Sequence, residues 1–341
     1  MRLMAVIDAS VRMSGLEDLT MYRSTASIPF AGRYRLIDFA LSNVVNSNIN
    51  LVGVFPAYPF VSLLDHIGVG KSWDLNRRKD GLFFLPGSQK AGNHVSVGAF
   101  SMLGEHRQFF AKSKQEHVVI TNCFTVAQLD FDDMLDAHLA SGTDITEAIC
   151  DDGTHLKSYI LSKKLLVELM ESYEEKKIIS IEDVVNRKKA PYTFNTYTHD
   201  GFVAVIDSTE NYFRSAMSLL EAGQREKLFL KDRPIYTKVK DEPPTKYLKG
   251  SQVSQALIGN GCTIAGSVKK SIISRAVLIE EDAQLENCII MQKSRVGKNC
   301  ELTCVIADKE VQIDDGVVLK GTWQHPIVLR KGERVTKEDV Q

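Results

Sequence analysis

Aliphatic residues recur at intervals of six positions over residues 258–319, and this period restricts the fold more than any other feature of the chain. Successive triplets stay in phase, and one turn takes 17 residues, one fewer than three full hexapeptides. The pattern predicts a parallel β-helix whose coils have three flat faces and direct the periodic residue to the axis. The strands of a β-sandwich could imitate one triplet, but hardly three in phase. The periodic residues are Ile258, Ile264, Ile273, Ile279, Leu285, Ile290, Val296, Leu302, Ala307, Ile313 and Leu319.

The preceding part of the chain alternates short apolar segments with amphipathic ones, which predicts an α/β domain with a mostly parallel sheet covered by helices on both faces. A linker with two prolines and four charges, residues 238–244, separates the two patterns. We therefore predict an α/β domain over residues 1–240 and a β-helix domain over residues 241–341. The expected strands are Met4–Ile7, Ile49–Phe55 and His117–Thr121, and the expected helices are Asp132–Ser141, Lys163–Lys176 and Tyr212–Leu220.

Composition excludes several classes of function. With 341 residues, 44% of them hydrophobic, the chain can bury a substantial core. A net charge of −1 argues against a surface for nucleic acid or membranes. Six cysteines are scattered without a C-x-x-C pair, which favours reduced, mostly buried thiols in a cytoplasmic protein. No N-terminal signal and no apolar run of about 18 residues is present, so we expect neither secretion nor a membrane span.

The first 43 residues carry a recognisable motif. A hydrophobic strand leads into the loop of residues 8–16, and the chain then reads I-P-F-A-G-R-Y-R-L-I-D-F over residues 28–39 and L-S-N over 41–43. This string resembles the start of glucose-1-phosphate adenylyltransferases, and similar stretches occur at 65–75 and 261–266. The resemblance covers nearly the whole chain. It implies a Rossmann-like nucleotidyltransferase domain with a mixed, mostly parallel sheet, followed by a left-handed parallel β-helix.

The phosphate-binding positions of that family differ here. Ser10, Val11 and Met13 stand where three glycines would let backbone N–H groups approach a triphosphate. Gly15 replaces the family's arginine and Thr25 its lysine. A phosphate loop needs close backbone approach and positive charge, so these replacements predict that the triphosphate site is lost.

The metal and sugar positions differ as well. By the resemblance, Phe124 and Val205 occupy the places of the two aspartates that hold Mg²⁺, and Ala57 replaces the glutamine that faces adenine. The family's sugar-phosphate segment is reduced to residues 150–158. The loss of two charge-stabilising groups alone raises a barrier by several kcal/mol, a factor of roughly 10³ or more. We therefore predict no catalytic residues, no metal site and no cofactor.

A chain that keeps the family's fold motifs but lacks its catalytic residues resembles the GlgD-type regulatory subunits of bacterial glucose-1-phosphate adenylyltransferase. The resemblance implies a cytoplasmic protein of glycogen synthesis that forms a heterotetramer with a catalytic subunit of the same fold, although self-association is also possible. The alternative is an active enzyme with a rebuilt site, in which Asp8, Asp130 or Asp207 would hold Mg²⁺. A hexapeptide-repeat acyltransferase is a remote third interpretation, because residues 258–319 contain no histidine.

Three basic residues, Arg23, Arg35 and Lys309, match positions at which the family binds phosphorylated effectors, and Arg33 between the first two is a fourth candidate. Arginine suits a phosphate because its planar fork donates paired hydrogen bonds. The competing interpretation is structural, with these arginines paired to Asp38 or Glu17. The sequence favours neither one.

Overall fold

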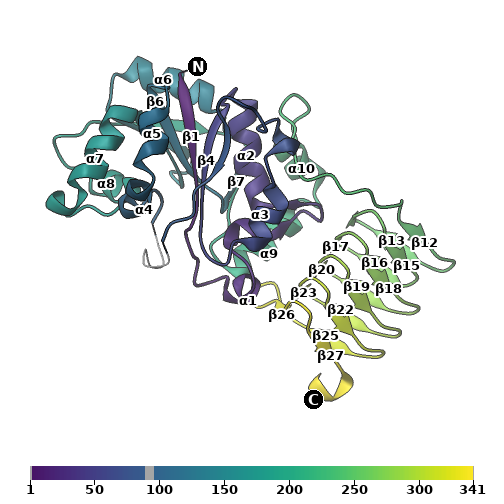
Figure 1. Ribbon diagram of the computed structural model, residues 1–341. Coiled ribbons are helices and arrows are strands. Elements are labelled where there is room, and N and C mark those ends of the chain that lie inside the picture. The colour runs from purple at the N-terminus through teal and green to yellow at the C-terminus, as the bar shows by residue number, and fades with distance from the viewer. Residues whose placement is uncertain (1, 89–95, 341) are drawn as a thin grey trace.

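A computed structural model describes residues 2–88 and 96–340, which form an α/β part and a β-helix (Figure 1). The α/β part contains a seven-stranded sheet in the order β10-β8-β9-β6-β1-β4-β5. Every pair is parallel except the two that β9 makes, so the sheet is mixed and mostly parallel, as predicted. The strands are β1 Leu3–Ala9, β4 Leu51–Pro56, β5 Gly81–Phe84, β6 His117–Asn122, β8 Ile145–Cys150, β9 His155–Ser162 and β10 Phe194–His199.

Helices cover both faces of this sheet, which explains why β1 is buried at every position. Side chains alternate along the strand, so Ala5 and Ile7 join one core cluster while Met4 and Val6 join the other. Helices α2 and α6 pack in the first cluster, and α4, α5, α7 and α8 in the second. The helices are α1 Glu17–Thr20, α2 Leu36–Asn46, α3 Val61–Ile67, α4 Phe100–Glu105, α5 Arg107–Lys112, α6 Phe131–Ser141, α7 Lys163–Lys176, α8 Ile181–Arg187, α9 Thr209–Ser218 and α10 Ala222–Leu228.

The predicted elements lie where the sequence places them, with shifts at their ends. Helix α7 has the predicted bounds because the Ser162 side chain accepts a hydrogen bond from the Leu165 amide, and the chain leaves the helix at Lys177 with φ 52°. Strand β4 begins two residues later than predicted, after a turn in which Asn48 has φ 56°. Helix α9 begins at Thr209, where the sequence Asp207–Glu210 predicts a helix start capped by serine or aspartate, and Ser208 is the cap; the helix ends at Ser218, two residues earlier than predicted.

The β-helix has three parallel sheets of short strands, and the predicted inward residues stack in register. Ile273 lies opposite Ile290, which lies opposite Ala307, and the other two columns follow the same rule. The repeat continues past the predicted end at residue 319 as far as Val335. The strands are β12 Lys246–Tyr247, β13 Gln252–Ser254, β14 Leu257–Ile258, β15 Thr263–Ile264, β16 Ser267–Lys269, β17 Ile272–Ile273, β18 Leu278–Ile279, β19 Gln284–Glu286, β20 Ile289–Ile290, β21 Arg295–Val296, β22 Glu301–Thr303, β23 Val305–Ala307, β24 Gln312–Ile313, β25 Val318–Lys320, β26 Ile327–Leu329 and β27 Arg334–Val335.

One sheet of the β-helix packs against the α/β part. Its outward-facing residues Ile272, Ile289 and Ile306 are buried in a core cluster that also contains Phe30 and Phe213. The two parts therefore share an apolar interface. They are also joined by an extended segment between α10 and β12, within which the sequence analysis divides the chain.

Four smaller strands complete the α/β part. Two of them pair near the contact with the β-helix: β2 Pro29–Phe30 with β3 Tyr34–Arg35. Next to the main sheet, β7 Thr125–Ala127 pairs with β11 Val203–Val205. All six cysteines are free, five of them buried. Among the helices that the structure describes, none combines the length and apolar character that crossing a bilayer requires.

Candidate functional site

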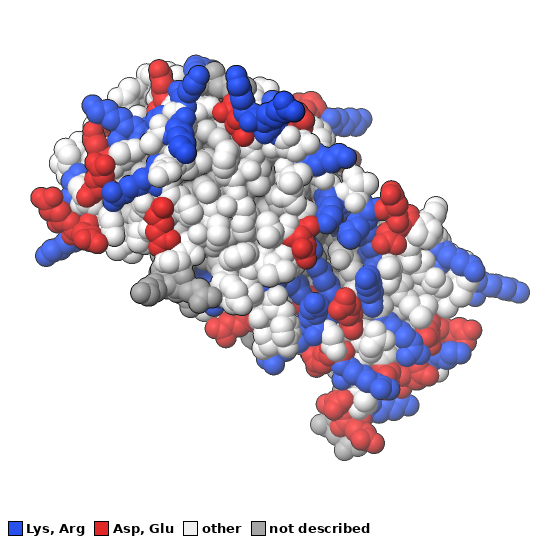
Figure 2. All heavy atoms as spheres, in the orientation of Figure 1, with Lys and Arg blue, Asp and Glu red and all other residues white. Residues whose placement is uncertain are grey.

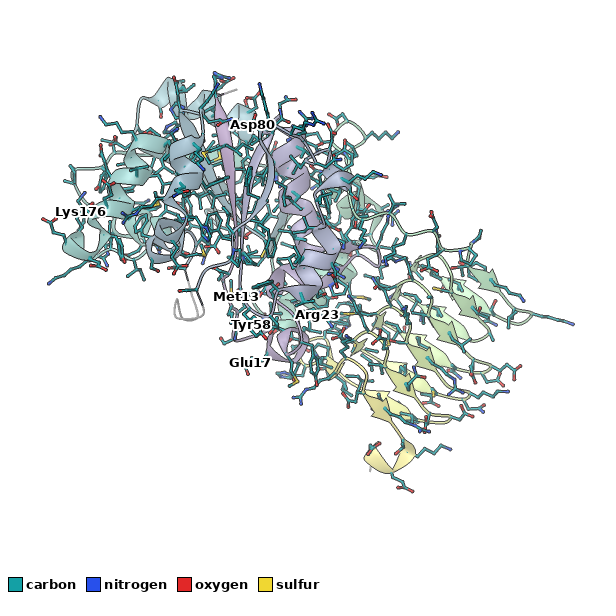
Figure 3. The ribbon with its side chains drawn as sticks, viewed as in Figure 1. Met13, Glu17, Arg23, Tyr58, Asp80 and Lys176 are labelled. Atoms are coloured by element: carbon teal, nitrogen blue, oxygen red, sulfur yellow. The ribbon has the colours of Figure 1, made fainter. Side chains whose placement is uncertain are left out.

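The loops that should carry the nucleotide chemistry meet at the carboxyl edge of three parallel strands, β4, β1 and β6. Ser10 follows β1, Ala57 follows β4 and Phe124 follows β6. The Ala57 amide donates to the Ala9 carbonyl at 3.2 Å, and Val205 lies opposite Thr125 in the adjoining strand pair. Ligands of open α/β sheets bind at this edge. The structure therefore brings these replaced positions to one edge of the sheet. In Figure 3, Met13 from the loop after β1 and Tyr58 from the loop after β4 lie near each other at this edge.

A carboxylate closes the loop after β1. Asp8 is fully buried, and its Oδ1 accepts hydrogen bonds from the Ser10 amide at 2.9 Å and the Ser10 hydroxyl at 2.6 Å. Its Oδ2 accepts one from the Gly98 amide at 2.7 Å. A phosphate loop presents such N–H groups to its ligand, whereas here the protein's own anion takes them. The negative charge of Asp8 would also repel a phosphate.

Side-chain and backbone packing fill the rest of the loop. Val11 is buried in the core, and half-buried Met13 packs beside it. At Gly15 an added Cβ would lie 2.7 Å from the Asp207 carbonyl oxygen, so no larger residue fits without movement of the backbone. In the sequence, Gly15 is distinguished only as a replacement of the family's arginine. The structure shows that the space for this arginine is occupied too.

The loop retains one cation, Arg12, that was not among the residues predicted from the sequence. Exposed Arg12 donates a hydrogen bond to the Tyr58 carbonyl oxygen in the loop after β4. Its position within the loop of residues 8–16 could have identified it from the sequence. Thr25, at the lysine position, is buried, and its hydroxyl donates to the Val11 carbonyl at 3.3 Å.

The positions matched to the metal aspartates offer no oxygen ligands. Phe124 is fully buried in an apolar cluster, and half-buried Val205 packs against the same cluster. The Lys157 ammonium lies 5.8 Å above the Phe124 ring and pairs with Glu182 at 2.8 Å. Mg²⁺ requires oxygen ligands in near-octahedral geometry. These two residues do not fit a metal ion.

The three carboxylates of the rebuilt-site alternative are engaged elsewhere. Asp8 accepts hydrogen bonds from Ser10 and Gly98. Asp130 caps α6 by accepting from the Asp132 and Asp133 amides and pairs with Arg233. Exposed Asp207 accepts from the Asn211 side-chain amide at 2.6 Å. Over residues 2–88 and 96–340, no group of three or more His, Cys, Asp or Glu side chains is placed to hold a metal ion.

Of the four basic candidates, Arg23 joins the two parts of the molecule. Its Nη2 donates to both carboxylate oxygens of Asp308 at 2.8 and 2.7 Å, and both side chains are almost fully buried. The structural interpretation named other partners, and this part of it is wrong. Asp38 accepts from the backbone amide of Arg35 and pairs with His66, while no ion pair of Glu17 occurs among the described residues.

Arg35 and Lys309 lie close enough to Arg23 to form one cationic cluster. The Arg35 guanidinium donates to the Ser62 carbonyl at 2.6 Å and hydroxyl at 3.1 Å. Burial, and then the charges of Arg35 and Arg23, lower the pKa of Lys309 to about 7. Burial likewise lowers the pKa of Arg35 to about 10. In the described part of the chain, no carboxylate lies within ion-pair distance of the Lys309 ammonium. The cluster has more positive charge than Asp308 can balance.

Arg33 does not join this cluster. Its guanidinium lies 5.9 Å over the ring of Tyr34 and lines a separate pocket with Arg275. The structure thus brings three of the four predicted residues together and separates the fourth.

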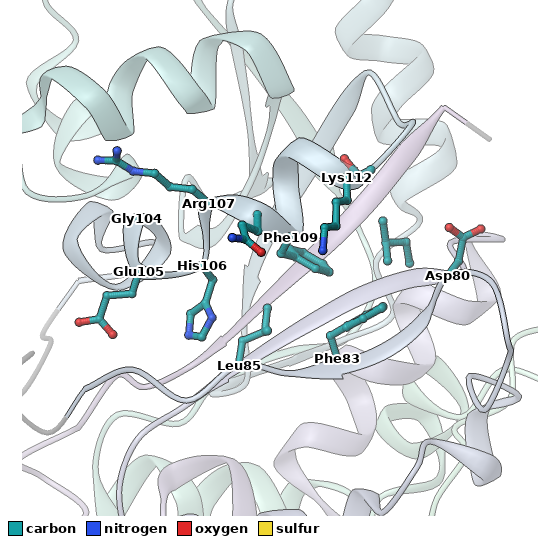
Figure 4. A pocket seen from close by; sticks show the side chains of 12 residues that line it. Asp80, Phe83, Leu85, Gly104, Glu105, His106, Arg107, Phe109 and Lys112 are labelled. Atoms are coloured by element: carbon teal, nitrogen blue, oxygen red, sulfur yellow. The ribbon is translucent and has the colours of Figure 1, made fainter.

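A cavity of about 710 Å³ lies away from all these positions, between β5 and the α4–α5 region (Figure 4). Phe83 and Phe109 face each other in it with ring centroids 5.4 Å apart. Two of the polar groups in the lining have partners, since Glu105 accepts from Ser88 and His106 contacts the Pro86 carbonyl. None of the sequence-predicted site residues lines this cavity.

Comparison with known proteins agrees with the two-part fold. The family model for nucleotidyl transferases matches residues 14–158, and that for the GlmU-like, C-terminal hexapeptide matches residues 243–322. The chain is 44% identical over 331 residues to the glycogen biosynthesis protein GlgD of Bacillus subtilis strain 168, covering 97% of this chain and 96% of that protein. It is 46% identical over 332 residues to GlgD of Geobacillus stearothermophilus, with the same coverage.

The chain belongs to the GlgD family. It is more distantly similar to the glucose-1-phosphate adenylyltransferase of Bacillus cereus strain Q1, with 25% identity over 358 residues that cover 93% of this chain and 94% of that enzyme. The resemblance seen in the sequence motifs, including the GlgD type, is confirmed.

Proposed function

We propose that this chain is a regulatory, non-catalytic subunit of glucose-1-phosphate adenylyltransferase that acts in glycogen biosynthesis in the cytoplasm. Its partner is a catalytic subunit of the same fold, and the assembly is a hetero-oligomer. GlgD relatives named as glycogen biosynthesis proteins support the pathway, and the full-length similarity to the adenylyltransferase supports the partner.

The observation that carries the non-catalytic role is the hydrogen bonding of Asp8. Its carboxylate takes the Ser10 amide that a triphosphate would need and adds negative charge at the same point. Phe124 places an aromatic ring at one matched metal position. Adenylyl transfer depends on groups that bind and neutralise the triphosphate, and a loop amide that already donates to a carboxylate is not available to a phosphate. We accordingly expect no metal cofactor, and Mg²⁺ would matter only if the rebuilt-site alternative held.

The regulatory part of the proposal rests on the cluster of Arg23, Arg35 and Lys309. Three cations around one carboxylate leave a net positive charge in a partly buried place between the two parts of the chain. A phosphate ester bound there would relieve this repulsion and contact both parts at once. Binding would thereby change how the β-helix and the α/β part pack, and a packing change can be transmitted to a partner subunit.

Co-assembly with the catalytic subunit tests the proposal. The two chains are mixed and separated by size, and ADP-glucose formation is measured over a range of phosphate-ester concentrations. We expect a stable complex whose effector response differs from that of the catalytic subunit alone. Lys309→Gln in this chain should shift the response, while Lys249→Gln, an exposed cation in the first coil, should not. Absence of a complex together with an unchanged response would refute the regulatory role.

The isolated chain provides the second measurement. We expect no magnesium-dependent release of diphosphate from ATP and glucose 1-phosphate above the buffer control. Release that depends on Asp8, Asp130 or Asp207 would favour the rebuilt-site alternative instead.

A further inference from the structure

The cavity between β5 and the α4–α5 region has the volume of a small-molecule site, about 710 Å³. It contains none of the replaced nucleotide positions and no residue of the cationic cluster. Strand β5 stands at the end of the seven-stranded sheet, so the cavity lies at the rim of the α/β part. On the face drawn in Figure 2, the middle of the α/β part shows few charged side chains, and Asp80, labelled in Figure 3, lies at the upper border of this area.

Phenylalanine rings form an apolar wall that is fixed by the core. Phe109 packs against Gly53 of β4, where an added Cβ would lie 2.9 Å from its ring. The Phe109 ring also contacts Phe110, with centroids 5.3 Å apart, and Phe83, with centroids 5.4 Å apart. Phe110 is fully buried, so packing holds this wall in place before any ligand binds. Phe83 nevertheless has 42% of its surface exposed, and a ligand with an apolar body would cover it.

The formal charges of the lining balance. Its acidic side chains are Asp80 and Glu105, and its basic ones are Arg107 and Lys112. Glu105 already accepts hydrogen bonds from the Ser88 amide and hydroxyl, both at 2.7 Å. In Figure 4 the Arg107 guanidinium points away from the phenylalanine rings. A lining with no excess of either charge does not attract a ligand of high net charge.

One acid and one base remain beside the apolar wall. Within residues 2–88 and 96–340, the side chains of Asp80 and Lys112 form neither a hydrogen bond nor an ion pair. Figure 4 shows Lys112 directed towards the ring of Phe109, while Asp80 lies past the ring of Phe83. A ligand that carries a carboxylate, an ammonium group and an apolar body would engage all three features of the cavity.

We propose that this cavity binds a free amino acid with an aromatic or large aliphatic side chain. Lys112 pairs with the carboxylate of the ligand, Asp80 pairs with its ammonium group, and its side chain packs on Phe83 and Phe109. A ligand with only one of the two charged groups leaves a charge of the cavity unpaired, and a small amino acid leaves Phe83 exposed. The site does not depend on the proposed regulatory role, because it shares no residue with the cationic cluster.

Ligand-observed saturation-transfer NMR on the full chain tests the site, with L-phenylalanine as the probe. We expect saturable binding of this probe. Binding should be weaker by roughly twofold or more for 3-phenylpropionate, which lacks the ammonium group, and for 2-phenylethylamine, which lacks the carboxylate. L-Alanine, which lacks the ring, should bind more weakly by about tenfold or more.

Variants assign the two charges. Asp80→Asn should weaken L-phenylalanine binding by about two- to fivefold without weakening that of 3-phenylpropionate, which has no ammonium group to pair with Asp80. Lys112→Gln should weaken L-phenylalanine binding to a similar extent without weakening that of 2-phenylethylamine. Phe83→Ala should weaken the binding of all three aromatic ligands. The matched control is Lys114→Gln, which removes an exposed cation outside the cavity and should change none of these affinities.

The three replaced side chains are exposed, so the variants should keep the melting temperature of the wild type. Melting curves recorded beside the titrations then separate a loss of binding from a loss of fold. Absence of saturable L-phenylalanine binding to the wild type would overturn the proposal. Equal affinity of the wild type, Asp80→Asn and Lys112→Gln for this probe would overturn it as well.

Discussion

The buried ion pair between Arg23 and Asp308 should control how firmly the two parts of the chain are joined. Both side chains are almost fully removed from water, with 3% and 2% of their surfaces exposed, and the closest atoms lie 2.7 Å apart. Removing one partner of a buried pair leaves an uncompensated charge and costs about 3–5 kcal/mol. The two possible deletions are not equivalent here.

Arg23→Ala leaves Asp308 with two favourable neighbours. The Lys309 amide donates to its Oδ1 at 2.6 Å, and the Lys309 ammonium lies near enough to be stabilised by the carboxylate. Asp308→Ala, in contrast, leaves Arg23, Arg35 and Lys309 together with no acid among them. We expect Arg23→Ala to lower the free energy of unfolding by about 3 kcal/mol and Asp308→Ala by about 5 kcal/mol. The double variant should lose less than the sum.

Equilibrium urea unfolding, followed by circular dichroism and by tryptophan fluorescence in a Trp73→Phe background that leaves Trp323 as the fluorophore, measures these changes. Trp323 packs edge-on against Phe213 with ring centroids 5.3 Å apart, so it reports on the contact between the β-helix and α9. The matched control is Arg330→Ala, which breaks a second pair between the same two parts, with Asp18. That pair is about half exposed and should contribute no more than about 1 kcal/mol. Equal losses for Arg23→Ala and Arg330→Ala, or a milder effect of Asp308→Ala, would refute the reasoning.

Three further predictions concern single sites. Folding lowers the pKa of Lys309 from 10.5 to about 7, so between these pH values the unfolded chain binds a proton that the folded chain lacks. The free energy of unfolding should therefore rise with pH across this window. Lys309→Met should flatten this rise in urea titrations performed at several pH values. Gly15→Arg restores the family's residue but should destabilise the fold by about 1–3 kcal/mol or more and create no ATP binding in calorimetry, whereas Gly223→Ala, where nothing lies within 4 Å, should not destabilise it. Ile289→Ala should lower the melting temperature through a loss of about 2–4 kcal/mol, while Val318→Ala on an exposed face should cost less than about 1 kcal/mol; equal shifts would contradict burial of the first by the α/β part.

Much of the fold follows from local pattern. The six-residue period identifies the inward residues of the β-helix because each coil must bury an aliphatic side chain along its axis. The bounds of α7 follow from an amphipathic stripe and a serine cap, both of which are local. The replaced positions at the nucleotide edge could also be named from the sequence, because the motifs around them resemble those of glucose-1-phosphate adenylyltransferases.

What lies around those positions required the tertiary structure. In the pairs Ile272–Ile273 and Ile289–Ile290, the period explains why the second residue faces inward, but only the packed α/β part explains why the first is buried as well. The sequence contains Asp8, Arg12 and Gly15, yet only the folded loop shows which amides Asp8 accepts from and which carbonyl excludes a side chain at Gly15. Arg23 and Asp308 are 285 residues apart, and the partner of such a residue depends on how two separately predictable parts dock. Periodicity reports local burial, whereas charge pairing and steric exclusion arise from contacts between distant segments.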